Sequence, residues 1–320
     1  MRILITGGAG FIGSNLADYL LARKDITLIR IFDNLATGSL DNISHLQKDN
    51  RFQFVEGDIR DYDKCLEASR NIDFISHQAA LGSVPRSVID PLTTNAVNIT
   101  GTLNIFNAAK ENGVKRVVYA ASSSTYGDHA DLPKKEEKIG NPLSPYAVTK
   151  YVNELYARVY SNVYGLELIG LRYFNIFGPR QSPNGPYAAV IPLFIEAILS
   201  GQSPVINGNG NHSRDFTYVD NAIQANINAL FTDNKKAVNQ VYNIACGEQT
   251  TLLQLYQFLQ EAAASQVAPV FGPDRKGDIL HSLADISKAR QMLGYDPEIS
   301  VKDGLIKTLN WYKQNRTKNK

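Results

Sequence analysis

Short apolar runs alternate with segments of helical periodicity through the first half of the chain. Candidate strands lie at residues 2–6, 27–32, 52–56, 73–76, 116–120 and 168–173. Candidate helices lie at residues 11–21, 62–69 and 95–112, and a further helix carries Tyr146 and ends near Tyr164. Strands that alternate with helices predict βαβ units around a parallel sheet. We therefore expect an α/β fold built on a doubly wound parallel sheet.

The composition and the pattern of apolar positions change after Asn175. Residues 178–186 form a loop rich in proline and glycine that is too long for a simple turn, and short strands and helices follow it. We predict one domain in residues 1–175 and a smaller α/β lobe in residues 176–320. Loops over a rigid sheet usually carry ligand recognition, so we expect the second lobe to bind the substrate.

Bulk composition adds few constraints. The 320 residues are 43% hydrophobic and 20% charged with a formal net charge of +2, which gives no basis for a nucleic-acid partner. Cys65 and Cys246 are far apart and make no metal-ligand pattern, so we expect a reducing compartment and no metal site. No apolar run approaches the ~20 residues of a membrane span, and we expect a cytoplasmic protein without a membrane partner.

A glycine fingerprint follows the first strand and precedes the first helix. Gly7 permits the tight turn, Gly10 lets the backbone approach a pyrophosphate, and Gly13 lets the helix pack closely on the strand. Asp33 ends the second strand, where a carboxylate would accept hydrogen bonds from a ribose 2′-hydroxyl and repel a 2′-phosphate. The pattern predicts a Rossmann domain that binds NAD rather than NADP. Residues after the third and fourth strands are expected to pass near this cofactor: Asp58, Ile59, Ala79 and Ala80.

Tyr146 and Lys150 stand four residues apart on a predicted helix and therefore share one face. There the Lys150 ammonium would favour the phenolate and lower the pKa of Tyr146 from its reference of about 10. A tyrosine with a lowered pKa is a candidate acid/base near neutral pH. Taken alone, each residue has a purely structural interpretation, Tyr146 as a packing tyrosine and Lys150 as a surface lysine. The pair beside a dinucleotide fingerprint predicts proton chemistry.

These motifs resemble the extended short-chain dehydrogenase/reductase superfamily, and within it the nucleotide-sugar 4-epimerases. The resemblance covers the whole chain and is closest to bacterial enzymes that interconvert UDP-N-acetylglucosamine and UDP-N-acetylgalactosamine. Besides Tyr146 and Lys150, the stretches that carry it are residues 78–87, 122–129, 172–178, 207–208 and 214–220. The related 4,6-dehydratases place an Asp-Glu pair after their catalytic threonine. This chain has only hydroxyl side chains in the corresponding stretch, Ser122 to Thr125.

The resemblance implies a reversible oxidation of the sugar at C4, with NAD as hydride acceptor and a transient 4-keto sugar. Tyr146, beside Lys150, would take the proton of the 4-hydroxyl with the help of Ser122. For Ser123 a direct role and a supporting role are both open. The hydride would then return to the opposite face of the sugar. The implied cofactor contacts are Gly7, Gly10, Phe11, Ile12, Gly13, Asp33, Asn34, Asp58, Ile59, Ala79, Ala80, Asn98, Tyr146, Lys150 and Tyr173.

The resemblance also implies a UDP-sugar substrate. Arg214 and Arg275 match arginines that bind the diphosphate in bidentate fashion. The residue that sets the room near sugar C2 corresponds to Ser282, and a small side chain there would admit a 2-acetamido group. The implied substrate contacts are Gly82, Ser83, Ser122, Ser123, Tyr146, Asn175, Gln181, Ala189, Val190, Val205, Asn207, Arg214, Arg275, Asp278 and Ser282.

We therefore expect a UDP-N-acetylglucosamine 4-epimerase of bacterial surface polysaccharide synthesis. One alternative is an epimerase of plain UDP-hexoses or UDP-uronic acids. Another is a non-enzymatic NAD-binding sensor, which would keep the glycines but lose the serine–tyrosine–lysine set. The resemblance further implies a homodimer, in which helices near residues 95–112 and 147–164 pair across a two-fold axis as a four-helix bundle.

Overall fold

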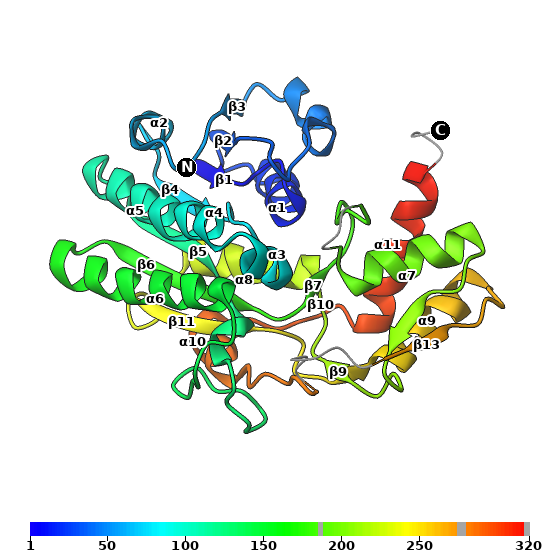
Figure 1. The fold of residues 1–320 in the computed structure, drawn as a ribbon. Helices are drawn as coiled ribbons and strands as arrows, with labels where there is room; N and C mark the ends of the chain where they lie inside the picture. Colours follow the sequence, from blue (N-terminus) through cyan, green and yellow to red (C-terminus); the bar gives the residue numbers. More distant parts are fainter. Residues whose placement is uncertain (185–187, 274–279, 317–320) are drawn as a thin grey trace.

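A seven-stranded parallel sheet forms the centre of the computed structural model, which describes residues 1–184, 188–273 and 280–316 (Figure 1). The strand order is β11-β6-β5-β4-β1-β2-β3, and all neighbours are parallel. The α/β doubly wound prediction is confirmed. The strands are β1 (Arg2–Thr6), β2 (Leu28–Asp33), β3 (Phe52–Glu56), β4 (Phe74–His77), β5 (Arg116–Ser122), β6 (Glu167–Tyr173) and β11 (Gln240–Ile244).

The strand order reverses between β1 and β4. From β1 the chain moves outward through β2 and β3, and then returns to the other side of β1 to form β4. At such a switch point the loops that leave two adjacent strands part in opposite directions, which opens a crevice at the carboxyl ends of the strands. The fold alone therefore places a ligand site beside the ends of β1 and β4.

Helices cover both faces of the sheet, and each face has its own apolar core. On one face α2 (Tyr62–Ala68), α5 (Thr102–Glu111) and α6 (Pro145–Tyr164) pack side by side (Figure 1). On the other face lie α1 (Phe11–Leu21) and α8 (Val219–Phe231), which contact each other. Because β1 is buried from Ile3 to Thr6, it appears in the sequence as a short apolar run.

Helix α6 has strong local signals at both ends. The Ser144 side chain accepts a hydrogen bond from the Ala147 amide at the N-terminus, and Pro145 occupies the first turn, where its missing N–H costs nothing. At the C-terminus Gly165 adopts a left-handed φ of 70°. These signals hold the first turn of α6, which carries Tyr146, in a defined position.

The predicted helix over residues 95–112 is confirmed, but it begins earlier and contains a π-helical turn. The segment consists of α4 (Pro91–Asn95), a π-helical turn (Ala96–Gly101) and then α5. A Cβ on Gly101 would lie only 2.5 Å from the side chain of Ile59, so the chain passes close to the end of β3 at this point. The wide turn places Asn98 in the interior, and such turns are frequent at functional sites.

The lobe on the right of Figure 1 contains the helices α7 (Val190–Ser200), α9 (Leu252–Ala263) and α11 (Val301–Arg316). Helix α10 (Ser287–Leu293) packs beside β11 at the edge of the central sheet. Short strand pairs accompany these helices: β7 (Ile176–Phe177) with β10 (Thr217–Tyr218), β8 (Val205–Asn207) with β13 (Val270–Gly272), and β9 (Ser213–Arg214) with β12 (Thr250–Thr251). The division at residue 175 stays a prediction, and the central sheet crosses it because β11 and α8 come from beyond that residue.

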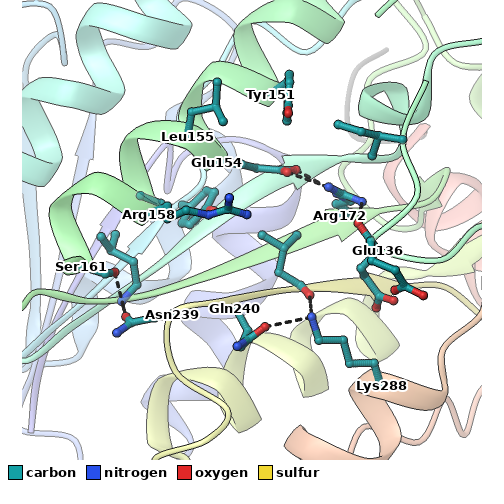
Figure 2. A pocket seen from close by; sticks show the side chains of 16 residues that line it. Glu136, Tyr151, Glu154, Leu155, Arg158, Ser161, Arg172, Asn239, Gln240 and Lys288 are labelled. Carbon is teal, nitrogen blue, oxygen red and sulfur yellow. Dashed lines mark hydrogen bonds and ion pairs between the residues drawn. The ribbon is translucent and has the colours of Figure 1, made fainter. Parts of the chain in front are cut away.

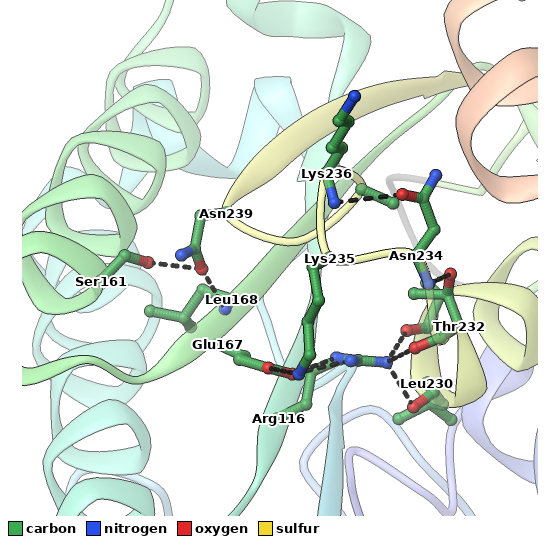
Figure 3. A network of polar contacts seen from close by, with 12 residues as sticks. Arg116, Ser161, Glu167, Leu168, Leu230, Thr232, Asn234, Lys235, Lys236 and Asn239 are labelled. Carbon is green, nitrogen blue, oxygen red and sulfur yellow. Dashed lines mark hydrogen bonds and ion pairs between the residues drawn. The ribbon is translucent and has the colours of Figure 1, made fainter.

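A buried arginine fastens α8 to the sheet (Figure 3). Arg116, at the start of β5, is 1% exposed, and its Nη1 donates to the carbonyl oxygens of Ala229, Leu230 and Thr232. The last carbonyls of a helix have no partner within it, so these bonds complete the end of α8. Arg116 also pairs with Glu167 at 2.7 Å. The two halves of the chain are thus joined through the sheet.

The remaining elements are short. They are α3 (Val84–Ile89) and the 3₁₀ turns η1 (Leu40–Asn42), η2 (Ser44–Lys48) and η4 (Ser123–Tyr126). Cys65 and Cys246 are free thiols. Within the described part of the chain, no helix combines the length and apolar character needed to span a membrane.

Candidate active site

A cavity of about 560 Å³ lies at the carboxyl ends of the central strands. It collects residues that follow β1, β2, β3, β4, β5 and β6, together with the first turns of α1 and α6. Most of the predicted site residues meet here: Gly7, Gly10, Phe11, Ile12, Gly13, Asp33, Asn34, Asp58, Ile59, Ala79, Ala80, Gly82, Ser122, Ser123, Tyr146, Lys150, Tyr173, Asn175 and Gln181.

The glycine turn after β1 forms a tight backbone cradle. Gly7 has a left-handed φ of +67°, and a Cβ on it would lie 2.6 Å from the backbone nitrogen of Ala79. A Cβ on Gly13 would lie 2.4 Å from the Gly7 carbonyl oxygen. Helix α1 starts after Gly10 with no side-chain cap, so its first N–H groups are available to a diphosphate. The cradle thus fits a dinucleotide.

Asp33 stands at the end of β2 with its carboxylate held by the backbone. Its Oδ2 accepts from the Ala9 amide at 2.9 Å and its Oδ1 from the Leu35 amide at 2.8 Å. Burial raises the pKa of Asp33, and the two backbone hydrogen bonds oppose that shift. Each oxygen keeps a second lone pair for a ribose hydroxyl. The position and orientation suit NAD.

The proton-transfer residues meet at the other end of the cavity. Ser122 ends β5, Tyr146 lies in the first turn of α6, and Lys150 lies one turn further along the same helix. Lys150 is 4% exposed, and its ammonium donates to the Ala120 carbonyl at 2.8 Å and lies 5.9 Å from the centre of the Tyr146 ring. All three residues line the cavity, so the structure joins the two motifs of the sequence in one site.

The expected lowering of the Tyr146 pKa by Lys150 is not found. Burial raises the pKa of Tyr146, and the hydrogen bond with Ser122 is what lowers it in part. Burial also lowers the pKa of Lys150 to about 8, because the charged ammonium is removed from water. The prediction is wrong because burial disfavours both charged forms, the Tyr146 phenolate and the Lys150 ammonium, and so opposes the charge pairing expected from the sequence.

Asn98 lies beneath the cavity and does not line it. It is completely buried, its Oδ1 accepts from the Leu81 amide at 2.8 Å, and its Nδ2 donates to the Thr149 hydroxyl at 3.1 Å. The side chain therefore holds the backbone after β4, which does line the cavity, against α6. Its direct contact with a cofactor stays a prediction.

Several predicted substrate residues lie away from the cavity. Ser83 caps α3, with its hydroxyl accepting from the Arg86 amide at 3.2 Å. The remaining residues belong to the second lobe. Ala189 and Val190 start α7, Val205 and Asn207 belong to β8, Arg214 belongs to β9, and Ser282 pairs with Ser213. Arg275 and Asp278 lie outside the described residues. Their roles stay predictions.

A separate hollow in the second lobe lies beside several of these residues. It is lined by Gly208, His212, Phe271 and His281, among others, and therefore adjoins β8, β9 and the backbone of Ser282.

The cavity also contains residues that sequence reasoning missed. Thr93 and Val97 come from α4 and the π-helical turn, and Arg60 pairs with Asp58 at 2.6 Å. Ser124 lines the cavity as well, and its amide donates to the Ser122 hydroxyl at 3.1 Å. The four-residue spacing of Thr93 and Val97 could have indicated that both side chains lie on one helix face.

A second cavity of about 400 Å³ lies on the far side of α6 (Figure 2). The buried Arg172–Glu154 ion pair, with an Nη2 to Oε2 distance of 2.7 Å, forms part of its wall, and Arg158, Glu136 and Lys288 contribute further charges. None of the predicted site residues within the described ranges lines it. The chemistry of the sequence motifs belongs to the first cavity.

Comparison with known proteins agrees with this geometry. The chain matches the NAD dependent epimerase/dehydratase family over residues 3–245. It belongs to this family. A putative UDP-glucose 4-epimerase of Methanocaldococcus jannaschii is 38% identical over 315 residues, which cover 98% of this chain and 99% of the relative.

Solved structures of family members are similar over the whole chain. A UDP-N-acetylglucosamine 4-epimerase from Methanobrevibacter ruminantium, in complex with UDP-N-acetylmuramic acid, has a TM-score of 0.92 at 39% identity and covers 98% of both chains. A UDP-glucuronic acid 4-epimerase from Bacillus cereus, in complex with UDP-glucuronic acid and NAD, has a TM-score of 0.90 at 32% identity and covers 98% of this chain and 99% of its own. Family membership and the glycine cradle confirm NAD as the cofactor.

Proposed function

We propose that this family member is a UDP-sugar 4-epimerase. The observation that carries the proposal is the convergence of Ser122, Tyr146 and Lys150 on the cavity that also holds the glycine cradle and Asp33. Bound NAD supplies the hydride acceptor and donor. The residues of the chain orient the sugar and move one proton at its 4-hydroxyl.

The proposed roles follow from the contacts. The Tyr146 phenol exchanges the proton of the sugar 4-hydroxyl, and its hydrogen bond with Ser122 favours the phenolate that accepts this proton. Lys150, which donates to the Ala120 carbonyl at the end of β5, supplies positive charge below a pH of about 8. Ser123 lines the cavity beside Ser122 and supports the same end of the sugar.

Elimination of water, the dehydratase reaction of this family, is not supported by the lining of the site. Ser123 and Ser124 follow Ser122 and present hydroxyls to the cavity. A carboxylic acid and carboxylate are the groups that would protonate a leaving hydroxyl and remove a carbon-bound proton. Among the described residues, the carboxylates that line the cavity are Asp33 at the end of β2 and Asp58 after β3, whereas Tyr146 lies on α6.

We propose UDP-N-acetylglucosamine and its 4-epimer as the substrate pair. Gly82 lines the cavity, and a Cβ on it would meet no atom within 4 Å, which leaves open space for a substituent on the sugar. Asn175 and Gln181 offer amide groups that suit an acetamido side chain. The Methanobrevibacter ruminantium protein supports the same choice by its name.

Plain UDP-hexoses are the second candidate, because the Methanocaldococcus jannaschii relative is named a putative UDP-glucose 4-epimerase. The described cavity is less suited to UDP-uronic acids. Among the described residues that line the cavity, the lysine and arginine side chains are Lys150 and Arg60, and Arg60 is paired with Asp58. A sugar carboxylate would lack a dedicated cation at this end of the described cavity.

A substrate panel tests the function. Purified protein is incubated with UDP-GlcNAc, UDP-Glc and UDP-GlcA, and both 4-epimers of each sugar are quantified over time. We expect epimerisation, fastest for UDP-GlcNAc. Protein that holds NAD but converts none of the three would instead support a non-enzymatic NAD-binding role.

We further propose the homodimer in which the helices near residues 95–112 and 147–164 pair across a two-fold axis, with exposed apolar side chains of α6, α3 and α4 beside them. Val159 and Val163 on α6 are 50% and 65% exposed, and Val88, Ile89 and Leu92 are 63%, 73% and 82% exposed. Exposed apolar side chains on these helices favour an interaction site. Light scattering at micromolar concentration should give twice the monomer mass of 35.4 kDa, and a monomer would reject the proposal.

A further inference from the structure

The loop that follows β7 carries Gln181 into the cavity but is held from outside it. Gln181 lines the cavity, its Nε2 donates to the Ile176 carbonyl at 3.2 Å, and its buried Oε1 has no hydrogen-bond partner among the described residues. An unpaired buried acceptor is costly, so this amide oxygen is suited to a donor on a ligand. The position of this loop therefore affects how the site receives its substrate.

Arg180, the residue before Gln181, faces away from the cavity. Its Nη2 pairs with the Asp18 carboxylate of α1 at 2.6 Å, and its side chain is 15% exposed. Asp18 is bound on its other oxygen by His45 Nε2 at 2.6 Å. Arg180 also has a left-handed φ of 69°, a conformation that a non-glycine residue keeps only where its surroundings enforce it.

Other contacts hold the same loop in place. Asn15 of α1 donates to the Pro179 carbonyl at 3.0 Å, and the Tyr312 hydroxyl of α11 donates to the Gln181 carbonyl. Helix α1 is the helix whose first turn faces the dinucleotide site, through Phe11 and Ile12. The sugar end of the cavity is thus fastened to the cofactor-binding helix.

We propose that Arg180 is a positioning residue, which through its ion pair with Asp18 fixes Gln181 at the sugar end of the cavity. The inference rests on the proposed function. Arg180 acts through its neighbour and not on the ligand, because it does not line the described cavity and its Nη2 pairs with Asp18. Loss of the pair would let the loop relax from its strained conformation and move the Gln181 amide.

The test compares Arg180→Ala, Gln181→Ala and the double variant on the best UDP-sugar of the wild type. We expect each single variant to lower kcat/KM by roughly ten- to hundredfold, mainly through KM, since small misplacements of a binding group have effects of that size. The double variant should be no worse than the poorer single variant, because both changes remove the same contact. Arg180→Lys, which keeps the charge, should recover part of the loss, and Asp18→Asn should resemble Arg180→Ala.

The matched control is Arg23→Ala, which breaks an exposed arginine–aspartate pair of 2.7 Å just beyond the same helix. We expect it to stay within about twofold of the wild type, because surface ion pairs contribute little. Additive losses in the double variant, or Arg180→Ala with wild-type KM and a lowered melting temperature, would show a purely structural pair. A wild type that epimerises no UDP-sugar would instead refute the proposed function.

Discussion

Replacing Gly7 by alanine tests the cradle on which the cofactor site depends. Two effects are combined at this position. The residue adopts a left-handed φ of +67°, and a Cβ would lie 2.6 Å from the nitrogen and 2.7 Å from the Cα of Ala79. Both neighbours are backbone atoms at the end of β4, so they cannot rotate away. The chain offers a matched control in Gly165, which has a φ of +70° and no atom within 4 Å of an added Cβ.

The magnitudes separate the two effects. The left-handed conformation alone costs an alanine ~1–2 kcal/mol, which is the whole cost expected for Gly165→Ala. Overpacking against a fixed neighbour adds ~1–3 kcal/mol, so Gly7→Ala should lose ~2–5 kcal/mol in the free energy of unfolding. The strain should also displace Ala79, which lines the cavity, and so weaken NAD binding.

Urea denaturation of the two variants and the wild type measures these losses, and NAD content after gel filtration measures the site. We expect Gly165→Ala to retain NAD and Gly7→Ala to lose most of it. Equal destabilisation of both variants, with NAD retained in both, would refute the argument that the close approach of two strand ends requires a glycine.

Three further predictions concern the catalytic and substrate ends of the site. Tyr146→Phe should fold and retain NAD but lose epimerisation by roughly 10²- to 10⁴-fold, the usual range for a general acid/base; Tyr151→Phe, which alters the second cavity, is the control and should stay active. Lys150 has a folded-state pKa of about 8, below the unfolded-state value of 10.5, so the unfolded chain binds more protons between these values and stability rises with pH there. Urea denaturation of the wild type and of Lys150→Met measures this effect. The difference between their unfolding free energies should rise by up to about 3 kcal/mol from pH 8 to pH 10.5. A difference that stays constant with pH would contradict the burial of the ammonium. Ser282→Tyr should lower kcat/KM for UDP-GlcNAc roughly ten- to hundredfold more than for UDP-Glc, if the ring fills the space near sugar C2; equal losses on both sugars would indicate general damage.

Much of the first half of the fold can be predicted from the sequence. The helix Phe11–Leu21 and the strand Arg2–Thr6 match the prediction to the residue, because local apolar spacing and burial agree there. The meeting of Gly7, Asp33, Tyr146 and Lys150 in one cavity could also be predicted from the sequence, because the carboxyl ends of parallel strands share one edge of the sheet.

The differences arise from contacts between distant residues. The π-helical turn ends at Gly101, which packs against Ile59, and no local pattern contains this contact between distant segments. The direction of the Tyr146 pKa depends on burial, which overrides the attraction of a lysine four residues away. In the same way, β11 joins the sheet beside β6 through a pairing between segments about 70 residues apart.

The central claim is that the chain inverts a UDP-sugar at C4 by removing a hydride to bound NAD and returning it. UDP-GlcNAc labelled with deuterium at C4 tests this directly, with the product analysed by mass spectrometry and NMR after reaction in ordinary water. The account predicts UDP-GalNAc that keeps the deuterium at C4, because the hydride stays on the cofactor between the two transfers. Product that has exchanged the label for solvent hydrogen, or no epimer from this or any other UDP-sugar, would contradict it.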